Sequence, residues 1–102
     1  MHKDQILTQL RAHEAELKAA GIEKISVFGS VARGDATGSS DVDVVIRLSP
    51  ESSRGGFSYF ARLDALTQRL QEILGCPVDI VTEPIHKERL RRVIERDATL
   101  AF

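Results

Sequence analysis

The sequence predicts an α/β protein in which a small mixed β-sheet is flanked by helices. Amphipathic stretches with a period near 3.6 residues alternate with short runs rich in β-branched residues. Glycine follows the two clearest helical stretches, at Gly21 and Gly75, where a left-handed residue commonly ends a helix. With 102 residues in total, the chain is expected to form a single domain over residues 1–102.

The first half of the chain contains a predicted helix and two predicted strands. The apolar residues of the helix fall mostly on one stripe, which is typical of a helix packed against a core. The second strand opens with alternating Asp and Val and closes in a Val-Val-Ile run that indicates burial. The expected elements are a helix over 3–20, a strand from 22 or 24 to 28, a helical turn over 31–33, a turn-rich connection over 34–40 and a strand over 41–48.

The second half repeats the alternation after a polar passage at 49–58 that looks flexible. Pro50 and the pair Gly55-Gly56 argue against a regular element there. The order therefore becomes helix, strand, turn, strand, helix, strand, helix. The expected elements are a helix from 57 or 59 to 74, a strand over 76–81, a helix from Glu83-Pro84 to about 97 and a short edge strand within 99–102.

The most informative stretch is 25–46, because it combines two carboxylates with a phosphate-friendly turn. Asp41 and Asp43 are two residues apart in a predicted strand, so their side chains lie on the same face. Like charges this close favour a cation between them, and hard oxygen ligands suit Mg²⁺. Gly29-Ser30 offers backbone N–H groups and a hydroxyl that suit a phosphate. These residues predict a metal–nucleotide site.

Two other motifs overlap this stretch and are rejected. The pattern Gly29-x4-Gly34 has P-loop spacing, but the Lys-Ser/Thr pair that should follow is absent. The spacing of polar residues from Asp35 onward resembles a calcium loop, yet Ile46 occupies the position of the bidentate Glu.

Asp79 is a third acidic candidate, within the apolar run 78–81. A carboxylate in such a run either faces water at a sheet edge or has a partner, since buried charges are rarely left unpaired. If its strand lies beside the second strand, Asp79 can join Asp41 and Asp43 as a third metal ligand. Both interpretations stay open on the residues alone.

Composition limits the functional classes. The net charge is −1, so the chain as a whole does not attract nucleic acid or anionic membrane, and neither is an expected partner. No run approaches the roughly 18 apolar residues of a membrane span. The single Cys76 leaves no intrachain disulfide and is expected to pack as a small residue; together these features predict a cytoplasmic protein.

The last predicted helix is rich in basic residues. The pairs Glu88–Arg92 and Arg91–Glu95 have the spacing of surface ion pairs, which favours a solvated face. Contact with a partner or with nucleic acid is the alternative. The three histidines show no spacing typical of metal ligands.

Taken together, the motifs resemble a known family. The pattern Gly29-Ser30-x10-Asp41-x-Asp43, with Ala-Arg-Gly after the serine and Asp79 later in Val-Asp-Ile-Val, is similar to minimal nucleotidyltransferase domains of the DNA polymerase β-like superfamily. The resemblance covers nearly the whole chain, and all three carboxylate positions are filled. It implies the polymerase β-like nucleotidyltransferase fold.

The resemblance also implies a reaction and a role for each motif residue. The chain would transfer AMP from ATP to a hydroxyl, with two Mg²⁺ ions, and the counterpart of Asp79 also serves as general base in the family. Arg33 would be a further phosphate contact, the alternative being a solvated surface arginine. The residues implied to be catalytic and metal-binding are Asp41, Asp43 and Asp79, and those implied to bind the β- and γ-phosphates are Gly29, Ser30 and Arg33.

The expected acceptor is another macromolecule, because the chain is too short for a dedicated acceptor domain. Small solitary members of the family resemble antitoxins, whose partner is a HEPN ribonuclease toxin neutralised by adenylylation of a tyrosine. Two alternatives stay open at this point. One is an antitoxin that neutralises its partner by binding alone. The other is a transferase that acts on a small molecule or RNA as an oligomer, in which a neighbouring copy completes the site.

Overall fold

The computed structural model describes residues 2–35, 41–52, 54 and 56–102. Apart from a break in the first helix, the helices and strands of these residues follow the predicted order. The elements are α1 (Lys3–Ala12), α2 (Glu14–Ala19), β1 (Ile22–Phe28), α3 (Gly29–Arg33), β2 (Val42–Leu48), α4 (Phe57–Leu74), β3 (Val78–Thr82), α5 (Glu88–Asp97) and β4 (Thr99–Leu100).

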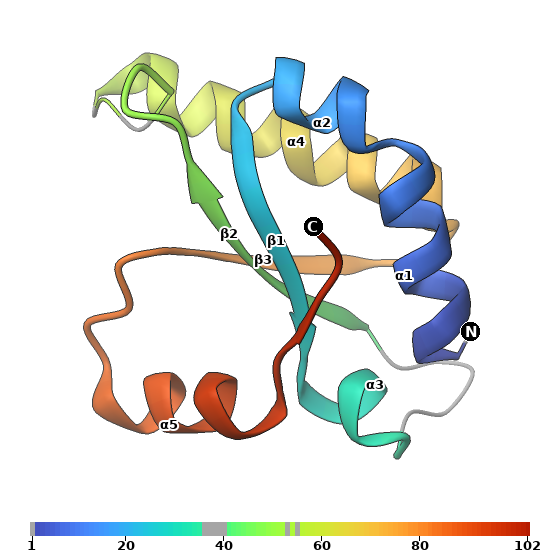
Figure 1. Cartoon of the computed structure of the whole chain (residues 1–102). Helices are drawn as coiled ribbons and strands as arrows, with labels where there is room; N and C mark the ends of the chain where they lie inside the picture. The colour runs from blue at the N-terminus through green and yellow to red at the C-terminus, as the bar shows by residue number, and fades with distance from the viewer. Residues whose placement is uncertain (1, 36–40, 53, 55) are drawn as a thin grey trace.

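The strands form one mixed sheet in the order β3-β2-β1-β4. β1 pairs antiparallel with both β2 and β4, whereas β2 and β3 run parallel. α4 forms the crossover between the two parallel strands, which need a long connection to return to the same edge. The predicted fold class, a small mixed sheet with flanking helices, is confirmed (Figure 1).

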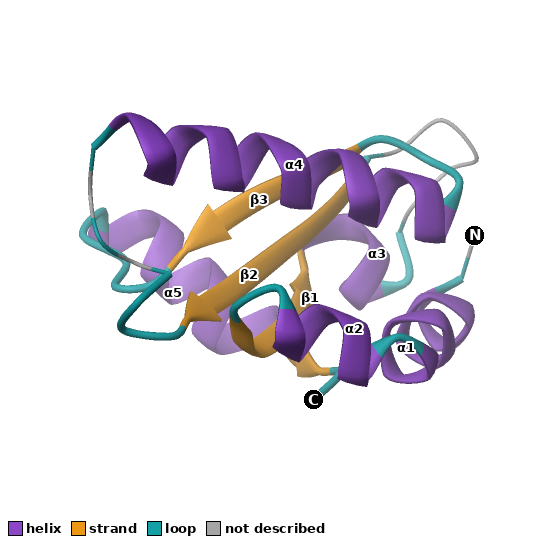
Figure 2. Cartoon of the chain, turned by 90° about the horizontal axis from the view of Figure 1, so that it is seen from above, coloured by secondary structure: helices purple, strands orange, loops and turns teal. Residues whose placement is uncertain are grey.

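Helices lie on both sides of the sheet, and the main core lies on one side. α1, α2 and α4 share that side, while α3 and α5 lie on the other (Figure 1, Figure 2). Every second residue of β2, from Val42 to Leu48, is buried in the core with α4 leucines such as Leu70. Because strand side chains alternate between faces, Asp43 and its neighbours in register face the side of α3 and α5.

The stretch 3–20 forms two helices, so the single predicted helix is wrong in this detail. The chain turns at His13, whose backbone N–H donates to the Leu10 carbonyl at 3.2 Å. Nδ1 of the His13 ring donates to the Gln9 carbonyl at 2.9 Å. In an unbroken helix this carbonyl would have accepted from the His13 backbone N–H. The ring thus replaces a backbone donor, and the helix axis changes direction there.

The last helix begins at Glu88, later than the predicted start at Glu83-Pro84. The Glu83 backbone N–H donates to the Ile46 carbonyl at 2.9 Å, so this residue still belongs to the edge of the sheet. A backbone group committed to a neighbouring strand cannot enter a helical ladder, and the helix starts only after Lys87.

Other boundaries differ from the predicted ones by one to two residues. α3 begins at Gly29, two residues earlier than expected, and β3 begins at Val78, two residues later, because Pro77 has no N–H for the ladder. The short edge strand expected within 99–102 is present as β4. The expected connection at 34–40 lies outside the described residues from 36 onward, as do residues 53 and 55 of the passage at 49–58. No described helix is long and apolar enough to cross a membrane.

Leu70→Ala is expected to destabilise the protein by about 3 kcal/mol, because it removes a fully buried side chain and leaves a cavity. Leu70 has no exposed surface in the core between α4 and the sheet. Urea unfolding followed by circular dichroism measures the effect, with Gln68→Ala on the exposed face of α4 as the control. A loss below about 1 kcal/mol for Leu70→Ala would contradict this description of the core.

Candidate active site

The sheet register brings together two acidic residues that are far apart in the sequence. β2 and β3 run parallel, and Asp43 is the register partner of Asp79. Residues in register on neighbouring strands point to the same face and are about 5 Å apart at the backbone. The condition that the sequence set for Asp79, a strand beside the second strand, is therefore met.

Asp41 lies immediately before β2 and is exposed, while Asp43 is half-buried. The pKa of Asp43 is raised above its ordinary value, first by burial and then by the negative charges of Asp79 and Asp41; the positive charge of Arg33 opposes this rise. Each of these charges acts on Asp43, so the carboxylates form one electrostatic cluster with a surplus of negative charge.

Gly29 is in contact with this cluster from the end of β1. The preceding residue, Phe28, is the antiparallel register partner of Asp43. Gly29 has φ +75°, and a Cβ added to it would collide with Oδ2 of Asp43. Because Gly29 has no side chain, its backbone can adopt a positive φ, and the Asp43 carboxylate has room to lie against it. The sequence pointed to a phosphate-binding role for Gly29 and not to this packing role.

α3 carries Ser30 next to the cluster. The helix has five residues and ends at Gly34 in the left-handed conformation. Val31 is buried in the main core, and the Asp35 N–H donates to the Ser30 carbonyl at 2.9 Å. Ser30 itself is half-buried at the start of the helix, where N–H groups have no helical partner.

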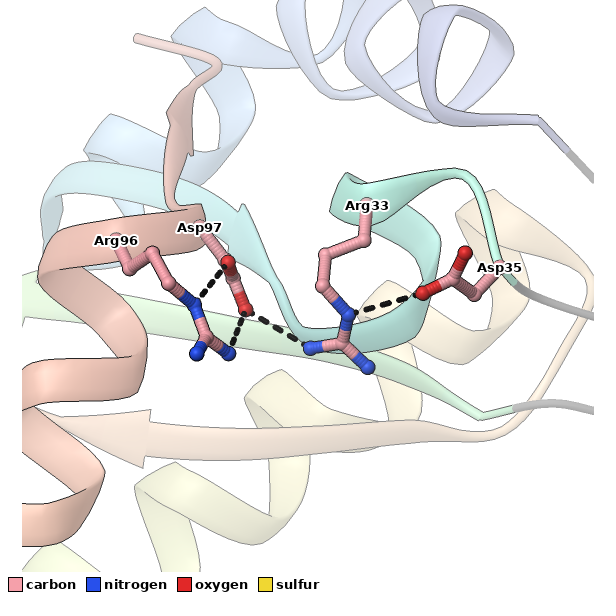
Figure 3. Close-up of polar contacts among 4 residues, drawn as sticks. All are labelled: Arg33, Asp35, Arg96 and Asp97. Carbon is pink, nitrogen blue, oxygen red and sulfur yellow. Dashed lines mark hydrogen bonds and ion pairs between the residues drawn. The ribbon is translucent and has the colours of Figure 1, made fainter.

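Arg33, the remaining candidate phosphate contact, is held by two carboxylates in this structure. Its Nε donates to Asp35 at 3.1 Å, and its Nη1 donates to Asp97 at 2.8 Å (Figure 3). Asp97 also receives two hydrogen bonds from Arg96. Asp97 was not a candidate from the sequence. The available signal was an acidic residue in the last turn of a helix, where the helix dipole disfavours negative charge.

The donor set fits a hard divalent cation such as Mg²⁺. Asp43 and Asp79 offer carboxylate oxygens side by side, and a cation between them would relieve the repulsion that raises the pKa of Asp43. Among the described residues, no group of three or more His, Cys, Asp or Glu side chains is already arranged to hold a metal ion. Mg²⁺ usually takes one or two carboxylates together with substrate phosphates and water, so two adjacent carboxylates are a suitable protein contribution.

Asp43→Asn is expected to raise the melting temperature of the metal-free protein by roughly 2–4 °C, because it removes a like charge opposite Asp79. Differential scanning calorimetry with a chelator measures this effect. Added Mg²⁺ should stabilise the wild type more than the variant, because the asparagine offers one neutral oxygen where the aspartate offers a charged carboxylate. A variant that is less stable than the wild type without metal would contradict the electrostatic description of the cluster.

The lowered pKa of Asp97 is expected to make the stability of the fold depend on pH. Hydrogen bonds from Arg96 and then Arg33 lower the pKa of its carboxyl from 3.8 to about 2. A carboxyl with a lowered folded-state pKa stabilises the fold at pH above about 4, and this contribution is lost as the pH falls towards 2. The difference in unfolding free energy between wild type and Asp97→Asn should therefore shrink between about pH 4 and 2, which urea unfolding at several pH values can measure.

The basic residues of α5 mostly face solvent in ion pairs. Arg92 and Glu88 are 2.8 Å apart, and Arg91 and Glu95 are 3.9 Å apart, so both predicted pairs are confirmed. Pairs this exposed contribute little to stability. Cys76 is partly buried against the core, as expected for a small packed residue, and burial raises the pKa of its thiol.

The sequence matches known proteins over most of its length. The family model of the nucleotidyltransferase domain matches residues 7–101. A provisionally named protein adenylyltransferase of Methanocaldococcus jannaschii is 34% identical over 90 residues, which are 86% of each chain. The protein adenylyltransferase MntA of Thermococcus cleftensis is 30% identical and matches 92% of this chain and 90% of its own.

Solved structures agree with these matches. A structure provisionally described as a minimal nucleotidyltransferase superposes with a TM-score of 0.75 at 30% identity, over 97% of this chain and 95% of its own. An MNT antitoxin in complex with a tri-AMPylated HEPN toxin of Shewanella oneidensis superposes at 0.63 over 94% of this chain and 71% of its own; at 15% identity this likeness shows the fold alone. The chain belongs to the nucleotidyltransferase domain family and has the fold of its minimal members.

Proposed function

We propose that this nucleotidyltransferase transfers AMP from ATP to a tyrosine hydroxyl of a HEPN-type toxin and thereby acts as its antitoxin. The observation that carries the proposal is the register of Asp43 with Asp79, with Gly29 packed against the Asp43 carboxylate. Relatives named protein adenylyltransferases, matched over most of their length, support the reaction. The likeness in fold to an MNT antitoxin that binds a HEPN toxin supports the class of partner.

In the proposed reaction the acceptor oxygen forms a bond to the α-phosphorus of ATP. The bond from that phosphorus to the bridging oxygen breaks, and pyrophosphate leaves with the bonding electrons. The hydroxyl proton passes to Asp79, whose carboxylate is exposed. Mg²⁺ held by Asp41, Asp43 and Asp79 would neutralise charge on the phosphates and lower the pKa of the attacking hydroxyl.

The other proposed site residues bind the triphosphate. Gly29 and Ser30 would bind the β- and γ-phosphates through backbone N–H groups and the Ser30 hydroxyl. The guanidinium of Arg33 would add a charged contact to a phosphate oxygen. The phosphates bring negative charge to a place where three carboxylates already repel each other, so cation binding and nucleotide binding should reinforce each other.

The test uses this protein and a candidate HEPN-type partner, both purified and mixed with Mg²⁺ and ATP labelled at the α- or the γ-phosphate. The expected result is label on the partner from α-labelled ATP and none from γ-labelled ATP, at a tyrosine identified by mass spectrometry. Asp41→Ala/Asp43→Ala should abolish labelling, and Asp64→Asn on the exposed face of α4 is the matched control. No label on the partner, or equal labelling by the double variant, would overturn the proposal.

The same assay separates catalysis from neutralisation by binding alone. The partner's ribonuclease activity is measured after the antitoxin has been removed from the labelled complex. Under the proposed function, activity stays low after exposure to the wild type and returns after exposure to the double variant. If the double variant silences the partner as completely as the wild type does while both are bound, binding alone is sufficient for neutralisation.

A further inference from the structure

Asp97 is an unusual residue for its position. It is the last residue of α5, and its side chain is only 5% exposed in its ion pairs. A carboxylate there meets the negative end of the helix dipole and loses most of its hydration. Two guanidinium groups, those of Arg33 and Arg96, compensate for both effects.

The two arginines differ in what they connect. Arg96 is the neighbouring residue on α5 and binds Asp97 through two hydrogen bonds, at 2.9 and 3.2 Å. Arg33 comes from α3, 64 residues away in the sequence, and joins Asp97 at 2.8 Å. Asp97 would therefore remain paired through Arg96 if Arg33 were absent, whereas the Arg33 contact is the one that links α3 to α5.

The contact fixes the orientation of the Arg33 guanidinium. Asp35 holds Nε and Asp97 holds Nη1, so the planar fork is restrained from two sides. The remaining nitrogen, Nη2, makes no hydrogen bond to any described residue and points away from both carboxylates (Figure 3). Restrained in this way, the guanidinium presents one pair of N–H donors in a set direction.

Arg33 also lies within electrostatic reach of the carboxylate cluster, because its charge acts on Asp43. It belongs to a helix of five residues, which is too short to be stable without tertiary contacts. The buried Val31 anchors one side of this helix in the core, and the Arg33–Asp97 ion pair ties its end to α5. The position of Ser30 therefore depends on both anchors.

We propose that Asp97 is a positioning residue of the nucleotide site: it orients Arg33 so that Nη2 meets the triphosphate, and it ties α3 to α5. This proposal rests on the proposed function, because it needs a nucleotide at the carboxylate cluster. Asp97 does not contact the nucleotide in this arrangement and acts through Arg33. The proposal therefore extends the nucleotide site to α5, which lies outside the Gly29-Ser30-x10-Asp41-x-Asp43 motif.

Isothermal titration calorimetry of the wild type and its variants measures their affinity for MgATP. We expect Asp97→Asn and Arg33→Met each to weaken binding roughly tenfold, the scale typical of residues that orient a ligand-binding group. In the double variant, Asp97→Asn should add almost nothing to Arg33→Met, since the two residues act as a unit. Arg96→Met, which removes the other partner of Asp97 and leaves Arg33 in place, is the matched control and should stay within about twofold of wild type.

A second readout needs no nucleotide. The N–H of Gly34, the residue after α3, donates to the Val31 carbonyl at 3.1 Å, and hydrogen exchange of this amide reports on the order of the end of the helix. Asp97→Asn should speed this exchange in the free protein, and Arg96→Met should not. Should Asp97→Asn fold poorly, Arg33→Lys carries the same prediction, because a lysine keeps the charge and cannot hold the two-sided geometry.

The outcomes distinguish this proposal from the proposed function. If wild type binds MgATP and Asp43→Asn does not, the nucleotide site stands, and the Asp97 variants test the proposal on their own. Unchanged affinity in Asp97→Asn with a lowered melting temperature would assign Asp97 a structural role only and overturn the proposal. Additive losses in the double variant would also overturn it. A wild type that does not bind MgATP would overturn both proposals.

Discussion

Asp43→Asn is expected to slow the proposed AMP transfer to the partner by about 10³-fold, because the developing charge at the reacting phosphate would lose a central part of its stabilisation. Asp43 lies between the other two carboxylates, next to Asp79 in register and two residues after Asp41. Its loss therefore affects every cation position that the cluster can offer. Single-turnover labelling of the partner with α-labelled ATP measures the rate.

The control for this prediction is the same chemical change on an exposed helix face, Asp64→Asn, which should leave the rate within about twofold of wild type. Melting temperatures of both variants are needed as well. Asp43→Asn should melt no lower than wild type, so that lost activity cannot be attributed to unfolding. If Asp43→Asn keeps more than about a tenth of the wild-type rate, Asp43 is not part of the catalytic centre.

Gly29→Ala is expected to lower the transfer rate by roughly 100-fold and to destabilise the fold by about 1–2 kcal/mol. The methyl group would collide with the Asp43 carboxylate, and a displaced carboxylate would no longer face the other oxygens. The positive φ adds strain for any residue with a Cβ. The rate is measured as for Asp43→Asn, and stability by urea unfolding.

Gly75→Ala separates the two causes. Gly75 has φ +71°, close to that of Gly29, and a Cβ added there would meet nothing within 4 Å. It lies at the end of α4, so this variant should show the strain alone, with reduced stability and an unchanged rate. If both variants lose activity equally, the loss follows from destabilisation and not from the contact between Gly29 and Asp43.

The candidate site could be recognised from the sequence because its main signals are local. Asp41 and Asp43 share a face as a consequence of the strand period, and Gly29-Ser30 follows an apolar strand run. The fold class was accessible for the same reason, since the periods of helices and strands are recorded in neighbouring residues. The assignment of Asp79 to the site was only conditional, because a strand pattern does not show which strand will lie beside it.

The features that the sequence missed depend on contacts between distant residues. The helix break at His13 and the late start of α5 follow from single hydrogen bonds, to the Gln9 carbonyl and from Glu83 to Ile46. The packing of Gly29 against Asp43 requires the antiparallel pairing of β1 with β2. None of these contacts alters a hydrophobic period, so none leaves a pattern in the chain.

Local spacing thus establishes which residue types the site contains, and the sheet register and helix packing decide which of them meet. The strand order β3-β2-β1 places Asp79, Asp43 and the end of β1 side by side. The packing of α5 beside α3 brings Asp97 to Arg33. The physical reason is that periodicity arises from backbone geometry within one element, whereas pairing between elements is selected by burial and charge across the whole chain.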